Sequence, residues 1–159
     1  MISEYNEELL KAYIGTPSKV EWYKKAFTSF DKSGKNLTWY WNSWAILGGF
    51  WFFLYRKQMK IALIILFVVL ILGAILTLNI FIILYILSSV IIGGFATNLL
   101  YKDFKNHKKD IEKMFSDDAK RIGVMSIVAG VNSVALYAGV FAFVSLVLIF
   151  VGLYMMSTK

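Results

Sequence analysis

Few side chains in this sequence could perform acid–base or metal chemistry. His107 is the only histidine, and it stands among lysines. Carboxylates and cations then alternate along the chain: Lys109, Glu112, Lys113, Asp117, Asp118 and Arg121. Mixed charges at this spacing are typical of solvated ion pairs, and a catalytic dyad would need convergent groups in a cleft. We therefore expect His107 to be solvated and these carboxylates to pair with their basic neighbours.

Other signatures of chemistry are absent from the sequence. It has no H-E-x-x-H and no G-x-x-x-x-G-K, the motifs of a zinc protease and a phosphate-binding loop. It has no cysteine, which excludes disulfides, a thiolate nucleophile and thiol metal ligands. The polar residues Asn79, Asn98 and Asn132 lie near the ends of apolar stretches, where we expect capping or interhelical hydrogen bonds. The sequence predicts a protein that is not an enzyme and uses no cofactor or metal.

The distribution of charge indicates a membrane protein. Hydrophobic residues make up 58% of the 159, and the mean hydropathy is +0.64. The charged residues leave three uncharged segments, 36–55, 61–101 and 122–158. A helix crosses the roughly 30 Å hydrocarbon layer in about 20 residues. We therefore expect an all-α integral membrane protein with a helical hairpin, a further transmembrane helix, cytoplasmic amphipathic N-terminal helices and an interfacial aromatic helix.

Residues 1–38 are predicted to form a cytoplasmic helical region without a cleavable signal. Ser3 caps a first helix that ends at Gly15, and Pro17 prevents its continuation. Ser18 and Glu21 form a capping box for a second helix that ends at about Phe30. The apolar face of that second helix consists of Val20, Tyr23, Phe27 and Phe30. We expect this face to pack on Tyr5, Leu9 and Tyr13, and the alternative is that it rests among lipid headgroups.

Residues 58–101 are predicted to form the transmembrane hairpin. Its helices cover 60–78 and 80–101, with a turn near Leu78 and Asn79. An apolar stripe at helical spacing continues among the charges of the basic segment 102–121, at Leu100, Phe104, Ile111 and Phe115. The second helix is therefore expected to run on beyond the membrane.

Residues 122–159 are predicted to hold an interfacial approach and a C-terminal transmembrane helix. Ser116 caps the approach, which covers 117–131 and has Asp117 and Asp118 in its first turn. The chain changes direction near Asn132 and Ser133 and then crosses once, over 133–156. The alternative is a hairpin of two short helices. Small residues that allow close helix packing are Gly93, Gly94, Ser126, Gly130, Ala135, Gly139 and Ala142.

Segment 39–57 is rich in aromatic residues and is predicted to lie in, or dip into, the inner leaflet. The expected anchors are Trp39, Trp41, Trp44, Trp51, Tyr55, Arg56 and Lys57, with the cations reaching lipid phosphates. Lys and Arg flank both ends of the hairpin and are absent from its turn, which places both ends in the cytoplasm. A crossing of 39–55 would export the basic N-terminal region, against this rule. A plain short transmembrane helix is the alternative.

Several motifs resemble the DUF2628 family of small bacterial integral membrane proteins, whose function is unknown. The motifs are AYIG at 12–15, WYKKAFTSF at 22–30, WNSWA at 41–45, GGFWFFLYRKQM at 48–59, NLLY at 98–101 and the later His107. Only the W-F-x-L-Y-R-K core is distinctive. Gly49 stands where the family commonly has proline, and Ser43 is inserted in the N-W pair. The resemblance implies a bacterial inner-membrane topology and no particular chemistry.

These features predict a multi-pass protein of the bacterial inner membrane that acts as an adaptor or lipid-organising protein. Its partners would be anionic lipid headgroups, with a protein partner or a homo-oligomer also open, and nucleic acid is not expected. The alternative function is a small transporter or channel subunit that works as an oligomer.

Overall fold

The structure is a computed structural model that describes residues 4–157, with side chains described for 6–142, 144, 145 and 148. The described chain is helical and contains no strand, which confirms the all-α prediction. The elements are α1 (Glu4–Ile14), the 3-10 turn η1 (Pro17–Lys19), α2 (Val20–Ser33), α3 (Ser43–Gly48), α4 (Phe50–Tyr55), α5 (Met59–Ile75), α6 (Leu78–Met114), α7 (Asp118–Val128) and α8 (Ser133–Ser157).

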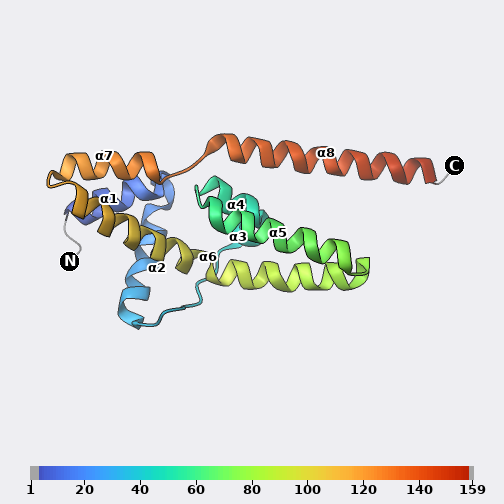
Figure 1. Ribbon diagram of the computed structural model, residues 1–159, viewed down its shortest axis with the longest axis horizontal. Helices are drawn as coiled ribbons and strands as arrows, with labels where there is room; N and C mark the ends of the chain where they lie inside the picture. Colours follow the sequence, from blue (N-terminus) through green and yellow to red (C-terminus); the bar gives the residue numbers. More distant parts are fainter. Residues whose placement is uncertain (1–3, 158–159) are drawn as a thin grey trace.

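The molecule has two parts that share the long helix α6 (Figure 1). We call the first part the head; it contains α1, α2, α7 and residues 95–114 of α6. We call the second part the body; it contains α3, α4, α5, residues 78–94 of α6, and α8. Within the described residues, α8 packs against α4, and beyond that contact it runs away from the head (Figure 1).

The head has its own aromatic core. The ring of Phe27 on α2 lies 5.3 Å from the ring of Tyr101 and 5.6 Å from that of Phe104, both on α6. The buried Tyr13 hydroxyl of α1 donates to the Leu100 carbonyl at 2.8 Å and to Asp103 Oδ2 at 2.9 Å. Burial, followed by the charge of Asp103, raises the pKa of Tyr13. The apolar face of α2 is thus buried inside the protein, against α6 as well as α1.

Helix boundaries in the head correct two predicted caps. Ser18 does not cap α2, because Pro17 starts a 3-10 turn and the chain is already helical there; α2 begins after Lys19 without a side-chain cap. Asp117, rather than Ser116, caps α7, and its carboxylate accepts from the backbone N–H groups of Ala119 and Lys120. The predicted cap Ser3 and the side chain of Tyr5 lie outside the described part of the chain.

An ion pair fastens α1 to α2 and gives a pH-dependent prediction. Lys24 Nζ lies 2.7 Å from Glu7 Oε2, and this hydrogen bond and charge lower the pKa of Glu7 below 4.5. Because the folded pKa is depressed, the stabilisation exists above the unfolded pKa and is lost as pH falls through the folded value. In an NMR titration, Lys24→Gln should move the Glu7 midpoint up towards 4.5. Lys32→Gln, on the same helix, should leave it in place, and an unmoved midpoint in Lys24→Gln would refute the pairing.

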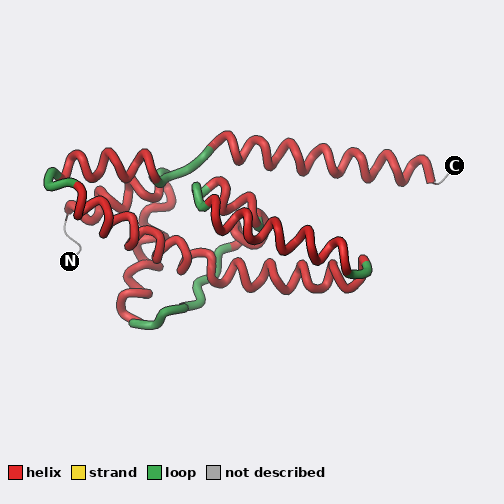
Figure 2. The backbone as a smooth tube through the Cα atoms, in the orientation of Figure 1, coloured by secondary structure: helices red, strands yellow, loops and turns green. Residues whose placement is uncertain are grey.

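The hairpin of the body forms as predicted, with a shifted turn. The turn lies at Leu76 and Thr77, both extended, so Asn79 falls in the first turn of α6 rather than between the helices. Thr77 is β-branched, which favours the extended backbone seen there. As predicted, α6 runs on without a break from the body into the head, through Met114. Figure 2 shows the short turn as a loop between two helices.

Two described stretches are long and apolar enough to cross a membrane, by length and composition. One is α6, and the other is Asp118–Ala142, which includes the bend between α7 and the first ten residues of α8. Helix α5 is apolar but shorter, at 17 residues. The bend lies at residues 129–132, close to the predicted change of direction, and α8 continues as one helix rather than two short ones.

Candidate functional site

The aromatic segment is not a single continuous helix. It forms two six-residue helices, α3 and α4, which meet at Gly49. Gly49 has φ +48° and ψ −125°, a conformation that side-chain-bearing residues rarely adopt, so the chain can reverse there. The single continuous helix of the alternative is therefore not observed over 39–55, whereas the placement of this segment in a membrane stays a prediction. We call residues 39–55 the aromatic hairpin.

The first limb of the aromatic hairpin, residues 39–48, docks on α6 through two glycines. The backbone N–H of Tyr40 donates to the Gly94 carbonyl at 2.8 Å, and that of Asn42 donates to the Gly93 carbonyl at 3.0 Å. A Cβ added at Gly93 would lie 2.1 Å from Ile46 Cγ1, and one added at Gly94 would lie 2.4 Å from Trp39 Cζ3. Only glycine leaves room for this approach, because any side chain would meet the hairpin.

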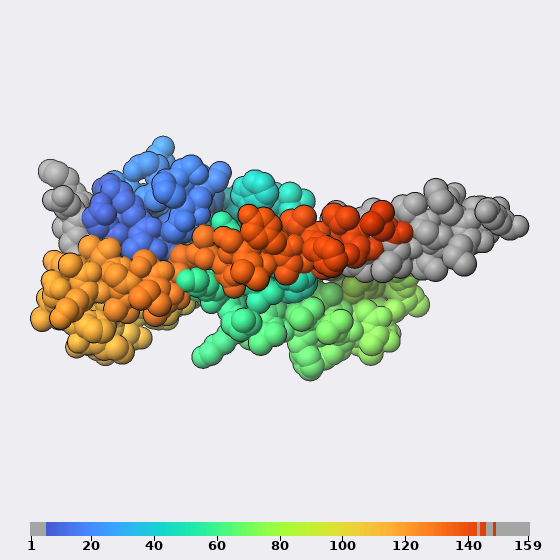
Figure 3. Space-filling model, turned by 90° about the horizontal axis from the view of Figure 1, so that it is seen from above, coloured from blue at the N-terminus to red at the C-terminus, as the bar shows by residue number. Residues whose placement is uncertain are grey.

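The second limb of the aromatic hairpin, α4, lies against α5 and α8. The Trp51 ring covers Gly139 of α8, where an added Cβ would be 3.0 Å from the ring. At the end of α4, the Tyr55 carbonyl accepts from the backbone N–H of Asn132 at 2.7 Å, where the chain bends into α8. In Figure 3, seen from above, α8 lies across this region. The hairpin thus joins the start of α8 to α5 and α6.

Both ends of the aromatic hairpin lie at the same end of the body. Its entry is fixed at Gly93 and Gly94, and its exit at Arg56 leads directly into α5. Its apex at Gly49 lies near the Tyr85 hydroxyl of α6, 4.0 Å from an added Cβ. The helix of each limb is six residues long, about 9 Å, which is roughly a third of a bilayer's hydrocarbon layer.

The predicted anchors divide between outward and inward positions. Trp39, Trp41 and Trp44 are exposed, with Trp44 at 68%, and Leu47 beside them is 80% exposed. Trp51 and Tyr55 are half-buried, and the Trp51 ring faces Gly139 of α8. Lys57 is exposed, and its Nζ donates to the Ile127 carbonyl of α7 at 2.9 Å.

The buried position of the Arg56 side chain differs from the prediction that its cation reaches lipid phosphates. The side chain is only 6% exposed, and Nη1 donates to the Ile14 carbonyl at the end of α1 at 2.7 Å. Its guanidinium also lies over the Tyr23 ring of α2, 4.7 Å from the centroid. The exit of the aromatic hairpin is therefore latched to two helices of the head.

A small polar cluster lies at the foot of the hairpin. Asn42 caps α3 by accepting from the Ala45 N–H at 3.3 Å, and its Nδ2 donates to Thr97 Oγ1 at 3.3 Å. Asn98, the next residue on α6, is 1% exposed, and neither polar atom of its amide has a hydrogen-bond partner among the described residues. By helical register, Asn98 shares a face with Gly94 and Tyr101.

The unpartnered amide of Asn98 predicts an unusual mutational effect. A buried amide without partners costs about 1–3 kcal/mol, so Asn98→Leu should raise the melting temperature of the purified protein in detergent. Asn42→Leu is the matched control, and it should lower the melting temperature because it removes a helix cap and the bond to Thr97. A lower melting temperature in Asn98→Leu would show that the amide has a partner.

The predicted stripe of small residues is not one packing surface. Gly93, Gly94 and Gly139 contact the aromatic hairpin, whereas the stripe is interrupted at the bend, where Gly130 has φ +84°. The Gly130 N–H donates to the Tyr13 carbonyl at 2.9 Å, and its Cα is 2.9 Å from a Cβ added at Gly15. Ser126 is exposed on α7 and bonds to the Gly123 carbonyl, and Ala135 and Ala142 are half-buried. Sequence reasoning missed the hairpin as the partner because the contacts are distant in sequence.

Several charged residues of the head form ion pairs. His107 lies on α6, with Nε2 3.4 Å from Asp103 Oδ2, rather than in a loop. Asp118 pairs with Arg121 at 2.7 Å, as predicted, whereas Glu112 pairs with Lys108 at 3.8 Å. Among the described residues, no three histidine, aspartate or glutamate side chains are grouped to hold a metal ion.

The aromatic hairpin packs against three helices and leaves apolar side chains exposed. Its contacts hold α6, α5 and the start of α8 together, and its outer tryptophans remain uncovered within the described chain.

Comparison of this chain with protein-family models, curated proteins and solved structures finds no match.

Proposed function

We propose that this chain is a non-enzymatic membrane protein in which the body lies in a bilayer and the head stands at its surface as an adaptor or lipid-organising module. One observation carries the proposal, the separation of exposed apolar surface from charge. The body and the residues that join α4 to α5 hold three charged residues, Arg56, Lys57 and Lys60, and the first two bond to carbonyls of the head. Its exposed apolar side chains include Leu63, Ile64, Phe67, Leu70, Ile83, Ile86, Leu87, Ile91, Val134, Tyr137 and Phe141.

The head has the opposite surface. Among its described side chains, the large apolar ones that are exposed are Met114, Ile127 and Val128. An apolar surface as large as that of the body is rare on a soluble monomer, and it is the ordinary surface of helices that face lipid. The separation supports a bilayer around the body and water around the head.

The aromatic hairpin then acts as a re-entrant segment in one leaflet. Non-helical backbone at membrane depth needs internal hydrogen bonds, and the carbonyls of Gly93 and Gly94 supply them for Tyr40 and Asn42. The exposed Trp39, Trp41 and Trp44 suit the headgroup boundary, where an indole can be partly apolar and partly wet. The basic head favours the cytoplasmic side, and the resemblance to DUF2628 supports a bacterial inner membrane and membership of that family.

Liposomes that contain the purified protein test this function against the transporter or channel alternative. We expect the protein to stay in the bilayer through an alkaline carbonate wash and to give no ion conductance above that of empty liposomes. Release by carbonate would refute the membrane location, and robust conductance would refute the adaptor function.

A further inference from the structure

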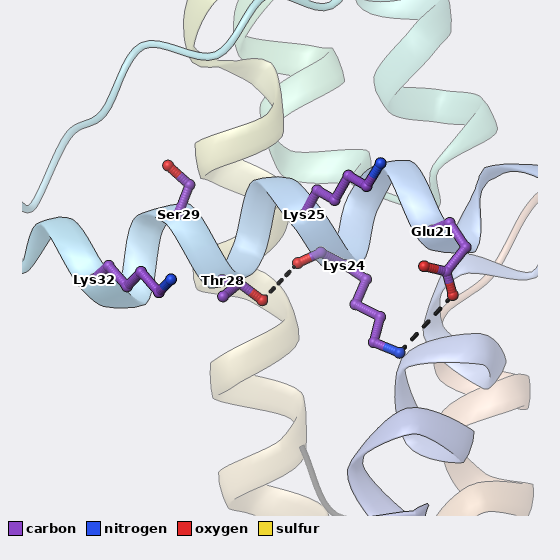
Figure 4. A pocket seen from close by; sticks show the side chains of 6 residues that line it. All are labelled: Glu21, Lys24, Lys25, Thr28, Ser29 and Lys32. Carbon is purple, nitrogen blue, oxygen red and sulfur yellow. Dashed lines mark hydrogen bonds and ion pairs between the residues drawn. The ribbon is translucent and has the colours of Figure 1, made fainter. Parts of the chain in front are cut away.

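Helix α2 carries a basic face with no counterpart inside the protein. A shallow depression on it is lined by Glu21, Lys24, Lys25, Thr28, Ser29 and Lys32 (Figure 4). Lys24 forms ion pairs with Glu7 and Glu21. Among the described residues, no carboxylate lies within ion-pair distance of the ammonium groups of Lys25 and Lys32 on α2, or of Lys35 just after its end. We call these three residues the lysine face.

The position of α2 relative to the body is fixed by aromatic contacts. Tyr40 bonds through its backbone to Gly94, at the foot of the body, and its ring lies 5.2 Å from Trp22 and 5.7 Å from Phe30 of α2. At the end of α2, the Ser33 and Thr38 hydroxyls are 3.1 Å apart. These contacts hold α2 beside Tyr40, where the chain enters the body.

The register of α2 decides which side chains face the body. Lys25 and Ser29 follow Trp22 at i+3 and i+7, so they share the face that meets Tyr40. Figure 4 shows Lys25 and Ser29 on the side of α2 towards the following loop and the body helices, and Thr28 on the opposite side. In Figure 1, α2 runs across the direction of α5 and α8, so it would lie along a bilayer that those helices cross.

We propose that the lysine face docks on the anionic headgroups of the leaflet that holds the aromatic hairpin. The inference rests on the proposed membrane location and adds a specific partner, a bilayer surface that contains anionic phospholipid. Charge complementarity favours this occupant, because the helix that carries Lys25 and Lys32 contacts Tyr40, whose chain neighbours Trp39 and Trp41 are exposed and suit the headgroup boundary. Each basic residue near such a surface favours the docked state by about fivefold, and the three lysines together by roughly a hundredfold.

Nanodiscs with the full chain test this docking. Ser29→Cys carries an environment-sensitive fluorophore, and the discs contain a lipid with a nitroxide on its headgroup. We expect stronger quenching in phosphatidylglycerol–phosphatidylcholine discs than in discs of phosphatidylcholine alone. The test variant is Lys25→Gln/Lys32→Gln/Lys35→Gln, which should lose this difference. The control variant removes equal charge from the far end of the head and should keep it: Lys109→Gln/Lys113→Gln/Lys120→Gln.

The outcomes separate the docking from the membrane location. Equal quenching in the two kinds of disc, or a difference that survives the test variant, would overturn the docking. The same fluorophore at Leu70→Cys, on the exposed face of α5, reports the location, and it should be shielded from a water-soluble quencher. Shielding at Leu70 without docking at Ser29 refutes only this inference, whereas an unshielded Leu70 refutes the proposed function itself.

Discussion

Gly93→Ala should destabilise the protein by about 1–3 kcal/mol, although glycine-to-alanine changes inside helices usually stabilise. The reason is the aromatic hairpin. An added Cβ would lie 2.1 Å from Ile46 Cγ1 and 3.3 Å from the Asn42 carbonyl oxygen, so the hairpin must move away from α6. Thermal unfolding in detergent should show a lower melting temperature and earlier exposure of a cysteine placed at Ile46.

Gly123→Ala is the matched control for this effect. Gly123 lies within α7, and a Cβ built there meets nothing within 4 Å. The substitution should therefore be stabilising by roughly 0.5–1 kcal/mol, because alanine loses less conformational entropy than glycine on folding. Equal effects of the two substitutions would mean that the hairpin does not dock on α6 at Gly93.

Arg56→Met should weaken the attachment of the head to the aromatic hairpin by about 2–4 kcal/mol. The change removes the bond to the Ile14 carbonyl, where a charged donor contributes about 1.5–3 kcal/mol, and the stacking on Tyr23, which contributes about 0.5–2 kcal/mol. Hydrogen exchange should accelerate at the end of α1 and the start of α2 more than in α5.

Two further substitutions sharpen the Arg56 result. Arg56→Lys keeps the charge but loses the planar group that stacks on Tyr23, so it should recover only part of the stability. Lys60→Gln removes a nearby exposed charge and should change stability by less than about 0.5 kcal/mol. If Arg56→Met and Lys60→Gln had the same small effect, the latch would not exist.

The sequence predicted features that depend on local signals. The uncharged segments predicted the helical hairpin, the apolar stripe through Phe104 and Ile111 predicted that α6 continues, and the interruption near Asn132 predicted the bend. These features follow from hydrophobic periodicity and from residues that break it.

Features that depend on distant contacts were not predictable in the same way. Arg56 bonds to Ile14, 42 residues away, so its inward direction cannot be inferred from its neighbours, which favour reaching towards lipid. Gly93 and Gly94 were predicted to pack helices, but their partner is a non-helical backbone that comes from residues 40–42. The capping box at Ser18 was wrong because Pro17 already starts a helical turn.

The central claim is that residues 39–55 enter and leave the same face of the bilayer. Single cysteines at Ser33, Lys60 and Asn79, all exposed positions, can be labelled in sealed vesicles with a membrane-impermeant maleimide. We expect Ser33→Cys and Lys60→Cys to react from one side and Asn79→Cys from the other. Labelling of Ser33→Cys from the side that labels Asn79→Cys would contradict it, since the aromatic segment would then cross.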